Sequence, residues 1–366
     1  MKQILYIKHA DSSFVLSDQR ILEKQYRVIP FLINQNRKGF YFLKRMAALT
    51  LFILSHARGT DAMVTWFGDY HSALMAFLGK FLSIRVIIFA GGQEAVCYPE
   101  LGKGVYNKKL RGCMVRYALK NAALIIPNHK SLIFHENFYY SDNGKKDGIK
   151  FYIPDLKTPV AIVPNGIDTS KFYRDPKVQK VPDLVLTVGT MSSVSDFINK
   201  GFDLFIQMAR RNTDLSFTLI GIKRQFLPWV EEHYQVSEIS NLELIFPYVP
   251  DEVLLLNYNK AKVFVQASIT EGMPNTLNEA MLCECIPVGS NVNGIPDAIG
   301  NTGIIVKRRN LDELEHAVRA ALNKDTGQDA RQHVLNNFSK VIREENLLVV
   351  FNQLFTKGNV SRKLNQ

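Results

Sequence analysis

Short apolar runs alternate with longer amphipathic stretches along the first part of the chain. Apolar runs of this length predict buried strands, and stretches with apolar residues three or four positions apart predict helices. Strands are expected at 4–7, 28–33, 62–66, 86–89 and 124–126, and helices at 19–26, 41–55, 71–81 and 105–121. This alternation favours an α/β fold in which helices cover a parallel sheet.

The alternation restarts after a turn-rich break. Residues 161–172 end a strand with the dipeptide Asn165-Gly166, and the polar, Pro-containing run that continues to Asp183 is typical of a linker. Further strands are expected at 184–188, 217–220, 242–246, 263–267, 286–288 and 303–306, and helices at 201–210, 276–283, 311–322 and 342–354. The pattern predicts two domains with a boundary near residue 160.

The composition fits two ordinary domains. With 366 residues, 46% of them hydrophobic, the chain can give each domain its own core. No stretch reaches the roughly 18 to 20 apolar residues of a membrane span, and the N-terminus lacks a signal-peptide core, so we expect a cytoplasmic protein. Four irregularly spaced cysteines predict free thiols, and Cys283 and Cys285 have no second pair of matching spacing, so no metal site is expected.

The formal net charge of +11 is unevenly distributed. Residues 1–160 hold 23 Lys and Arg against 11 Asp and Glu, whereas residues 161–366 hold 22 against 23. This asymmetry predicts an anionic partner for the first half, which can be a phospholipid surface, a polyanionic acceptor or nucleic acid. The basic residues on or near two of the expected helices are Arg37, Lys38, Lys44, Arg45, Lys103, Lys108, Lys109, Arg111, Arg116 and Lys120.

A basic amphipathic helix is typical of proteins that bind an anionic membrane surface. We therefore expect a peripheral position on the inner face of the cell membrane. No nucleic-acid-reading motif is found, and no nucleic-acid partner is expected.

The segment 271–279, Glu-Gly-Met-Pro-Asn-Thr-Leu-Asn-Glu, follows a buried strand and begins a helix. Gly272 and Pro274 mark the turn. Pro is favoured in the first turn of a helix, because the N–H that it lacks would have no partner within the helix. The N–H groups of Asn275, Thr276 and Leu277 point out of the helix start, where they and the helix dipole attract anionic oxygen. A diphosphate would fit there.

Two carboxylates frame this helix start. Glu271 precedes the turn and Glu279 lies inside the helix, so they can accept hydrogen bonds from different hydroxyl groups of one ligand. The segment resembles the signature of two Glu separated by seven residues in the retaining glycosyltransferases of family 4, and the flanking residues 257–270 and 280–290 are similar as well. The resemblance covers residues 160–350 well and residues 1–160 loosely.

The resemblance implies the GT-B fold, in which two Rossmann-like domains face each other across a cleft. It assigns residues 1–160 to the acceptor and residues 161–341 to a nucleotide-sugar donor of UDP or GDP type. The last helix, at about 342–357, would pack back on the first domain, and Asn165 and Gly166 would lie at the mouth of the cleft. The implied enzyme is a hexosyltransferase that retains configuration and needs neither metal nor cofactor.

The acceptor implied by the resemblance is a glycan or a lipid-linked glycan in envelope polysaccharide synthesis, such as lipopolysaccharide or capsule. Two other interpretations stay open at this point. One is a nucleotide-sugar 2-epimerase of the same fold, which would need no acceptor. The other is a basic nucleic-acid-binding protein without catalytic activity.

The resemblance also distributes roles around the donor. Glu279 would bind the ribose and Glu271 the sugar hydroxyls, while Gly272, Met273, Pro274, Asn275, Thr276 and Leu277 would surround the diphosphate. Lys200 would meet the diphosphate as its charge grows. Gly189 would also line this place, and Thr190 stands where the family usually has Arg, so Lys223 or Arg224 could supply the second cation. Tyr248 and Val249 would receive the base.

In the first half, candidate residues follow two expected strands. Gly91 and Gly92 permit close approach of the backbone to a donor, although a tight turn would need the same residues. Many family members have a His near the reacting sugar at this place, and this chain has none there. Glu94 is therefore the candidate to orient the acceptor or to serve as its base. Asp69 and His71 are expected to border the cleft on the acceptor side.

Overall fold

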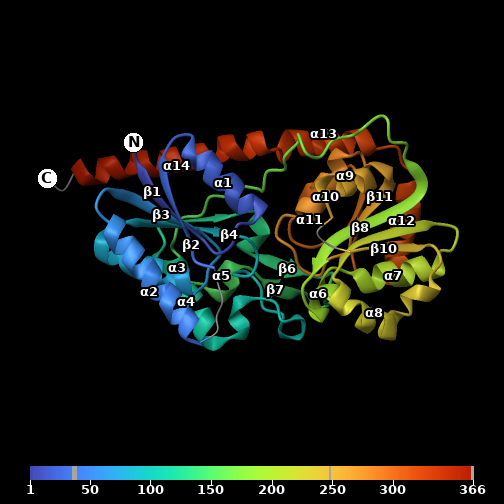
Figure 1. Ribbon diagram of the computed structural model, residues 1–366, viewed down its shortest axis with the longest axis horizontal. Coiled ribbons are helices and arrows are strands. Elements are labelled where there is room, and N and C mark those ends of the chain that lie inside the picture. The colour runs from blue at the N-terminus through green and yellow to red at the C-terminus, as the bar shows by residue number, and fades with distance from the viewer. Residues whose placement is uncertain (35–38, 247–248, 364–366) are drawn as a thin grey trace.

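The computed structural model describes residues 1–34, 39–246 and 249–363, with side chains described as far as residue 356. Two lobes lie side by side, each built on a parallel sheet (Figure 1). The N-terminal sheet has the order β2 (Arg27–Leu32), β1 (Gln3–Lys8), β3 (Thr60–Trp66), β4 (Arg85–Ala90) and β5 (Leu124–Pro127). The C-terminal sheet has the order β10 (Leu242–Ile245), β9 (Ser216–Ile222), β8 (Val181–Met191), β11 (Ala261–Gln266), β12 (Ile286–Ser290) and β13 (Ile304–Val306).

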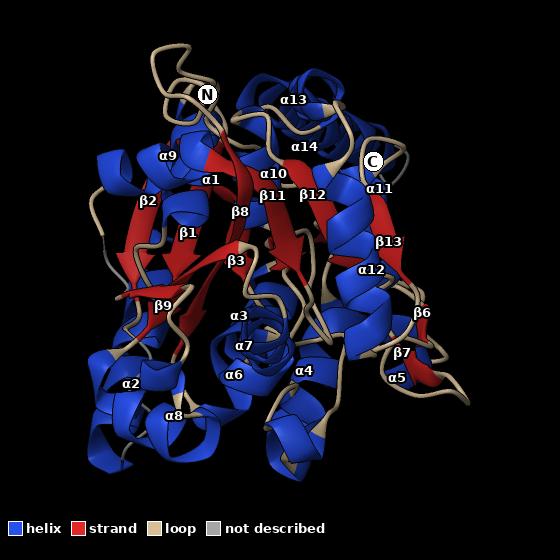
Figure 2. Cartoon of the chain, turned by 90° about the vertical axis from the view of Figure 1, so that its right-hand side faces the viewer, coloured by secondary structure: helices blue, strands red, loops and turns tan. Residues whose placement is uncertain are grey.

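Helices cover the strands on both sides (Figure 2). Those of the first lobe are α1 (Ser13–Glu23), α2 (Gly39–His56), α3 (Tyr70–Leu82), α4 (Lys109–Asn121) and α5 (Ile149–Tyr152). Those that follow are α6 (Val194–Asn199), α7 (Phe202–Arg211), α8 (Leu227–Tyr234), α9 (Asp251–Lys260), α10 (Asn275–Leu282), α11 (Ile295–Ile299), α12 (Leu311–Leu322), α13 (Gly327–Asn337) and α14 (Lys340–Lys363). Helices α6 and α11, which the sequence analysis does not predict, have six and five residues and are too short to give a clear periodicity.

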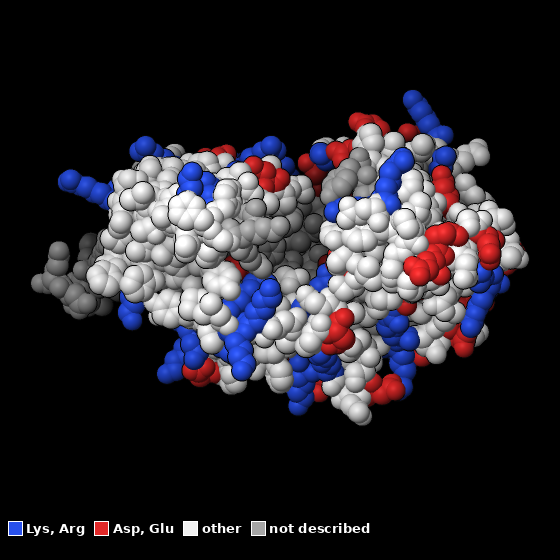
Figure 3. All heavy atoms as spheres, turned by 60° about the horizontal axis from the view of Figure 1, so that its bottom comes forward, with Lys and Arg blue, Asp and Glu red and all other residues white. Residues whose placement is uncertain are grey.

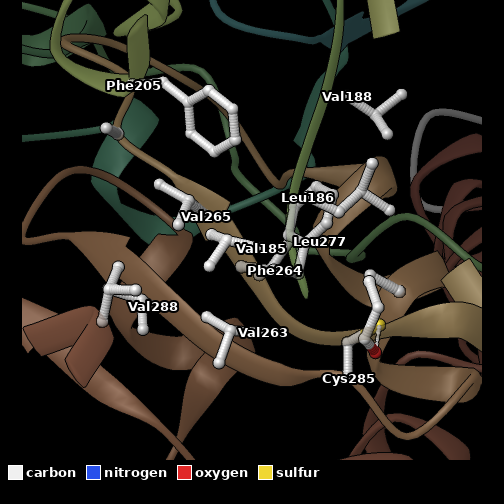
Figure 4. Close-up of a cluster of buried hydrophobic side chains, with 14 of the residues drawn as sticks. Val185, Leu186, Val188, Phe205, Val263, Phe264, Val265, Leu277, Cys285 and Val288 are labelled. Atoms are coloured by element: carbon white, nitrogen blue, oxygen red, sulfur yellow. Dashed lines mark hydrogen bonds between the residues drawn. The ribbon is translucent and has the colours of Figure 1, made fainter. Parts of the chain in front are cut away.

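The core of the C-terminal lobe forms around β8 and β11 (Figure 4). Val185 and Leu186 on β8 and Val263, Phe264 and Val265 on β11 are all buried. Central strands of a parallel sheet are covered on both faces, so they carry continuous apolar runs. The chain leaves β11 at the edge of this core and turns into α10, which fixes where the signature segment 271–279 lies.

The segment after residue 160 differs from the expected strand. Ile125 and Val160 form an isolated parallel bridge, and the N–H groups of Ala161 and Val163 donate to the carbonyls of Ile125 and Pro127 at 3.0 and 3.1 Å. The chain thus runs along β5 and crosses toward the second sheet without forming a full strand. The Asn165-Gly166 turn lies directly after this crossing.

A hairpin of the N-terminal lobe enters the core of the other lobe. Strands β6 (His135–Asn137) and β7 (Lys145–Asp147) pair antiparallel. Tyr139, in the loop between them, is buried in the C-terminal core, and its carbonyl accepts a hydrogen bond from the Arg309 N–H at 3.0 Å. Asn137 Nδ2 donates to the Ile269 carbonyl at 2.8 Å. These contacts fix the two lobes relative to each other.

Helix α14 leaves the C-terminal lobe and runs along the N-terminal lobe (Figure 1). Its Leu347, Phe351 and Phe355 are buried in a core cluster with residues of β1, β3 and α1. Arg343, near its start, is 3% exposed and pairs with the fully buried Asp18 at 2.6 Å. Nη1 of Arg343 also donates to the carbonyls of Val163 and Pro164, at 2.9 and 2.6 Å. The helix is thereby tied to the first lobe and to the crossing segment.

No helix in the described part of the chain is both long and apolar enough to span a bilayer.

Replacing Arg343 by Met is expected to lower the free energy of unfolding of the N-terminal lobe by about 3 to 5 kcal/mol, because Asp18 would stay buried without its partner. Denaturant titration of a Trp229→Phe background, followed by the fluorescence of Trp66, would measure this loss. Adding Asp18→Asn to Arg343→Met should recover part of it.

The matched control is Lys24→Met, which breaks the exposed pair between Lys24 and Glu344. It should cost less than about 1 kcal/mol. If Arg343→Met costs no more than Lys24→Met, the buried pair does not anchor α14.

Candidate active site

A cavity of about 770 Å³ opens between the lobes, where the carboxyl ends of both sheets meet. Figure 3 shows the hollow between the two lobes. The carboxyl ends of parallel strands are the usual place for ligands in such folds. The first lobe and the crossing segment contribute Phe14, Trp66, Phe67, Gly91, Lys103, Asn128 and Asn165. The second lobe contributes Val188, Gly189, Thr190, Ser192, Asp196, Lys200, Ile220, Gly221, Val249, Leu254, Glu271, Gly272, Met273, Pro274, Asn275 and Thr276.

Lys200 reaches the cavity because α6 passes directly into α7. Gly201, between the two helices, has a φ of +73°, and a Cβ there would lie 2.4 Å from the Ala267 carbonyl oxygen, so only glycine fits. The ammonium of Lys200 donates to Glu271 Oε2 at 2.6 Å, and each side chain is 23% exposed. The sequence-predicted cation and the first signature carboxylate therefore meet in one cavity.

The start of α10 lies beside this pair. Met273, Pro274, Asn275 and Thr276 line the cavity, and the helix begins at Asn275. The first N–H groups of a helix have no partner within it. Leu277 differs from the others because its side chain is fully buried in the core, so only its backbone N–H is left for a ligand.

Glycines bring the two lobes into contact at this helix start. A Cβ on Gly272 would lie 2.7 Å from the Gly91 carbonyl oxygen and 2.9 Å from Asn128 Oδ1, so a side chain would push the lobes apart. A Cβ on Gly91 would lie 2.4 Å from Phe67. Gly91 thus lies against the opposite lobe at the wall of the cavity, and its approach to a donor stays a prediction.

Glu279 faces a neighbouring cavity of about 410 Å³, which shares Phe14, Leu254 and Asn275 with the first. The Tyr258 hydroxyl donates to Glu279 Oε2 at 3.0 Å. Burial raises the pKa of Glu279 to about 7, against the opposing effect of the Tyr258 hydrogen bond. Since Asn275 and Glu279 are one helical turn apart, both point from the same face of α10 into this space.

Two asparagines bring unused acceptors to the larger cavity. Asn128 and Asn165 are 4% and 8% exposed, and their Oδ1 atoms have no hydrogen-bond partner in the described part of the structure. Asn165 Nδ2 donates to Asn275 Oδ1 at 3.0 Å, which ties the crossing segment to the start of α10. Buried acceptors of this kind are commonly satisfied by a bound ligand or water.

Glu94 does not occupy the expected acceptor position. Its side chain is fully buried, Oε1 accepts from the Gly68 N–H at 2.7 Å, and Oε2 accepts from the Gly92 N–H at 3.2 Å. Burial raises the pKa of its carboxyl group, while these backbone hydrogen bonds lower it. Glu94 therefore braces the loops after β3 and β4, and in this conformation it cannot contact an acceptor. Gly92, with a φ of +139°, completes that turn.

Asp69 and His71 are likewise structural in position. Asp69 caps α3 by accepting from the Tyr70 N–H at 2.9 Å, and it pairs with Arg111 at 2.8 Å. His71 is fully buried, with Nε2 2.9 Å from Thr65 Oγ1. The expectation that they border the cleft is wrong, because capping and burial turn both side chains into the lobe.

The expected base site is described only in part. Val249 lines the cavity, whereas Tyr248 lies outside the described residues.

The four cysteines, Cys97, Cys113, Cys283 and Cys285, are free thiols. No group of three or more His, Cys, Asp or Glu suited to a metal ion occurs within residues 1–34, 39–246 and 249–363.

Several cavity residues escaped the sequence analysis. Phe67 and Asn128 directly follow β3 and β5, and the rule that ligands bind at the carboxyl ends of parallel strands could have identified both. Lys103 and Asp196 carry no such signal. They meet in an ion pair across the lobes, although 93 positions separate them in the chain.

Comparison with known proteins gives a consistent result for the second lobe. Residues 182–324 match the family model described as glycosyl transferases group 1. The O-antigen chain mannosyltransferase B of Escherichia coli is 33% identical over 82 residues, which cover 22% of this chain and 22% of that protein. The GPI3 subunit of phosphatidylinositol N-acetylglucosaminyltransferase from Saccharomyces cerevisiae is 23% identical over 185 residues, covering 46% and 38%. The matches thus span well under two thirds of these relatives.

Solved structures establish the fold over nearly the whole chain. Sucrose-phosphate synthase from Thermosynechococcus elongatus has a TM-score of 0.73 at 14% identity and covers 98% of this chain and 100% of its own. Anabaena HepE in complex with UDP and glucose has a TM-score of 0.70 at 13% identity, covering 96% and 100%. The lipopolysaccharide outer core galactosyltransferase WaaB has a TM-score of 0.67 at 15% identity, covering 97% and 99%. The chain has the GT-B fold.

The pKa of Glu279 predicts a pH-dependent cost in stability. Because the folded state raises this pKa from 4.5 to about 7, the folded protein holds the proton more tightly, and stability falls as the pH rises from about 4.5 to 7. Glu279→Gln should therefore raise the free energy of unfolding at pH 8 by roughly 1 to 3 kcal/mol. This gain would be seen as a higher midpoint of thermal unfolding. At pH 5 the variant and the unchanged protein should melt alike.

Glu252→Gln, on the exposed face of α9, serves as the control and should show no such difference between the two pH values. Equal stabilisation of Glu279→Gln at both pH values would contradict the raised pKa.

Proposed function

We propose that the chain, whose residues 182–324 match the family model described as glycosyl transferases group 1, transfers a sugar from a nucleotide-sugar to a glycan or lipid-linked acceptor. The observation that carries the proposal is the pairing of Lys200 with Glu271 beside the start of α10, inside a cavity between two parallel sheets. The cavity thus combines the Lys200 ammonium, the N–H groups at the start of α10 and the Glu271 carboxylate, which can accept hydrogen bonds from hydroxyl groups. A nucleotide-sugar offers the matching diphosphate and hydroxyl groups.

The division of the two signature carboxylates between cavities supports distinct roles. Glu271 lines the larger cavity with Lys200, whereas Glu279 lines the smaller one. A nucleotide-sugar laid across both would place its diphosphate at the start of α10, its sugar at Glu271 and its ribose at Glu279. This agrees with the roles that the family resemblance assigns.

Lys200 and the start of α10 would stabilise the leaving diphosphate. An ammonium group has three donors, so Lys200 can keep its bond to Glu271 and also donate to a phosphate oxygen. As the bond from the anomeric carbon to the diphosphate oxygen breaks, charge grows on that oxygen and both interactions strengthen. We propose that no metal is required, because these groups supply the positive potential.

Retention of configuration is part of the proposal. The acceptor oxygen would attack the anomeric carbon from the face that the diphosphate leaves, and its proton would pass to the departing phosphate oxygen. The sequence shows no convincing pair of nucleophile and acid of the hydrolase kind. Glu94, the sequence-based candidate for a base, is occupied by two backbone N–H groups.

The acceptor and pathway rest on the relatives. An O-antigen chain mannosyltransferase and a phosphatidylinositol N-acetylglucosaminyltransferase subunit are among the similar proteins, and their names refer to the O-antigen chain and to phosphatidylinositol. We propose an acceptor of this class. UDP and glucose occur together in one structure of the same fold, which favours a UDP-type donor without excluding GDP.

The proposed function is tested by a screen of UDP- and GDP-sugars with lipid-linked oligosaccharide acceptors, with and without EDTA. Transfer should persist in EDTA.

Glu279→Ala should weaken binding of both nucleoside diphosphate and donor by roughly 1.5 to 3 kcal/mol. Glu271→Gln should leave nucleoside diphosphate binding intact and lower turnover about a hundredfold, because it displaces the sugar. Lys200→Ala should cost about 2 to 4 kcal/mol of transition-state stabilisation.

Release of an isomeric nucleotide-sugar without an acceptor would indicate an epimerase instead. If Glu271→Gln weakens bare nucleoside diphosphate as much as Glu279→Ala does, the division of roles is wrong.

Membrane association is proposed from α2 and α3. On α2, Phe40, Leu43, Leu51 and Leu54 are 81%, 63%, 68% and 50% exposed and recur at helical spacing, which places them on one face. Phe77 and Phe81 on the neighbouring α3 are 52% and 80% exposed. An exposed apolar stripe with nearby basic residues is typical of interfacial helices. We therefore propose a peripheral position on the inner face of the membrane.

Several basic residues of the N-terminal half are paired within the protein, so fewer of them are left to bind an anionic membrane than the sequence suggested. Arg111 pairs with Asp69, Lys103 with Asp196 and Lys120 with Asp155. Arg45 donates to the carbonyls of Leu32 and Ile33. Arg37 and Lys38 lie outside the described residues. Lys44, Lys108 and Lys109 are exposed, and Figure 3 shows Lys and Arg side chains along this face of the N-terminal lobe.

Vesicles of anionic phospholipid should bind the protein more tightly than neutral ones. Salt near 0.5 M should weaken this binding, because the Debye length falls to several Å. Reversing Lys44, Lys108 and Lys109 to Glu should abolish the preference, whereas Leu43→Ser with Leu51→Ser should weaken binding to both kinds of vesicle. Co-sedimentation measures each effect.

Reversing Lys177, Lys307 and Lys324, three exposed lysines of the other lobe, is the control and should have little effect. If this control triple lowers binding as much, the association follows net charge and not the proposed surface.

A further inference from the structure

An uncharged residue stands at one position beside the place where a diphosphate would lie. Thr190, directly after Gly189, stands where the family resemblance places an Arg, and it lines the larger cavity. The two substitutes considered from sequence do not line that cavity. Lys223 Nζ donates to Ser192 Oγ at 3.4 Å, and Arg224 lies over the Phe246 ring at 4.4 Å.

Lys103 comes to this cavity from the other lobe. Among the described residues that line it, Lys103 and Lys200 are the cations. The backbone of Lys103 is fixed by a two-way bridge with Tyr98, whose N–H donates to the Lys103 carbonyl at 2.9 Å and whose carbonyl accepts from the Lys103 N–H at 3.0 Å. The backbone of Lys103 is therefore held in an ordered loop by these two hydrogen bonds.

Asp196 ties the Lys103 ammonium to α6, the helix directly before Lys200. Lys103 donates to Asp196 Oδ1, and the two side chains are 20% and 10% exposed. Asp196 and Lys200 are four positions apart, and the Lys200 N–H donates to the Asp196 carbonyl at 2.8 Å, as in one helical turn. Residues so spaced lie about 5 to 6 Å apart at Cβ on one helix face. The two ammonium groups thus approach the same region from opposite lobes.

Asp196 can share Lys103 without losing its own support. Its Oδ2 accepts from the Ser192 N–H at 2.9 Å and from the Ser193 hydroxyl at 3.0 Å. Lys103 in turn has three donors, of which Asp196 uses one. A second anionic acceptor would therefore complete the coordination of Lys103.

We propose that Lys103 donates to the diphosphate of the donor from the N-terminal lobe and takes the place of the cation that Thr190 does not supply. This inference rests on the proposed function and adds a binding residue to it. It also couples donor binding to the contact between the lobes, since Lys103 would bridge Asp196 and the diphosphate.

The experiment uses calorimetry on the full chain with UDP, GDP and ADP, and with the nucleoside of whichever binds most tightly. Lys103→Met should weaken that nucleoside diphosphate about ten- to hundredfold, as expected for a charge-assisted hydrogen bond, and leave the nucleoside unchanged. Lys103→Arg should bind nearly as the unchanged protein. Lys108→Met, an exposed lysine of the same segment outside the cavity, is the matched control and should have no effect.

Rescue from the other lobe separates a phosphate contact from a latch between lobes. Adding Thr190→Arg to Lys103→Met should recover most of the lost affinity, whereas a mere latch could not be replaced from Thr190. Asp196→Asn breaks the same ion pair but leaves the Lys103 charge, so it should weaken binding of the nucleoside diphosphate much less than Lys103→Met does. Equal weakening by Asp196→Asn and Lys103→Met would overturn the proposal.

A measurement that keeps Lys103 covers the case in which its variants fail to fold. In the otherwise unchanged chain, Thr190→Arg should change affinity less than about threefold, because the place is filled, and a gain of about tenfold or more would overturn the inference. If Lys200→Met weakens binding and Lys103→Met does not, the inference fails while the proposed function stands. If the unchanged protein binds none of the three nucleotides, both fail.

Discussion

The buried ion pair between Arg343 and Asp18 joins three parts of the chain that are distant in sequence. The guanidinium reaches Asp18 on α1 from α14, and its remaining donor group holds the carbonyls of Val163 and Pro164 in the crossing segment. Trp66 Nε1 adds a hydrogen bond to Asp18 at 3.0 Å. Two buried charges are tolerable only when they are paired and fully hydrogen-bonded, so this pair holds α14 on the first lobe. Because Arg343 also holds Val163 and Pro164, the same pair positions the next residue, Asn165, at the mouth of the cleft.

The floor of the cleft depends on backbone contacts that leave no room for side chains. Gly272 meets the Gly91 carbonyl of the other lobe, and the Gly294 N–H donates to the Gly272 carbonyl at 3.0 Å. The hairpin loop at Tyr139 secures the lobes from another side. Because these contacts are made by backbone and by buried side chains, the start of α10 is held in place before any ligand arrives. Such preorganisation lowers the cost of binding.

The cavity balances its charges in pairs. Lys200 is paired with Glu271 and Lys103 with Asp196, so each of these partly buried cations has a carboxylate partner. Each ammonium still has donors to offer, which makes the cavity ready for a polyanionic ligand. By contrast, Glu94, Asp69 and His71 spend their hydrogen-bonding capacity within the N-terminal lobe. Polar residues at strand ends were therefore a sound guide to the region but not to the function of each residue.

The sequence alone determined the alternation of strands and helices, the two parallel sheets and the signature helix with Glu271 and Glu279. These features follow from local periodicity and from short spacings, which a single chain carries in its order of residues. The resemblance to the glycosyltransferase family also indicated Lys200. Only the tertiary structure decided that Glu94 turns inward and that Lys103 meets Asp196. The physical reason is that burial and pairing depend on which loops the fold brings together, and no local pattern encodes a contact across 93 positions.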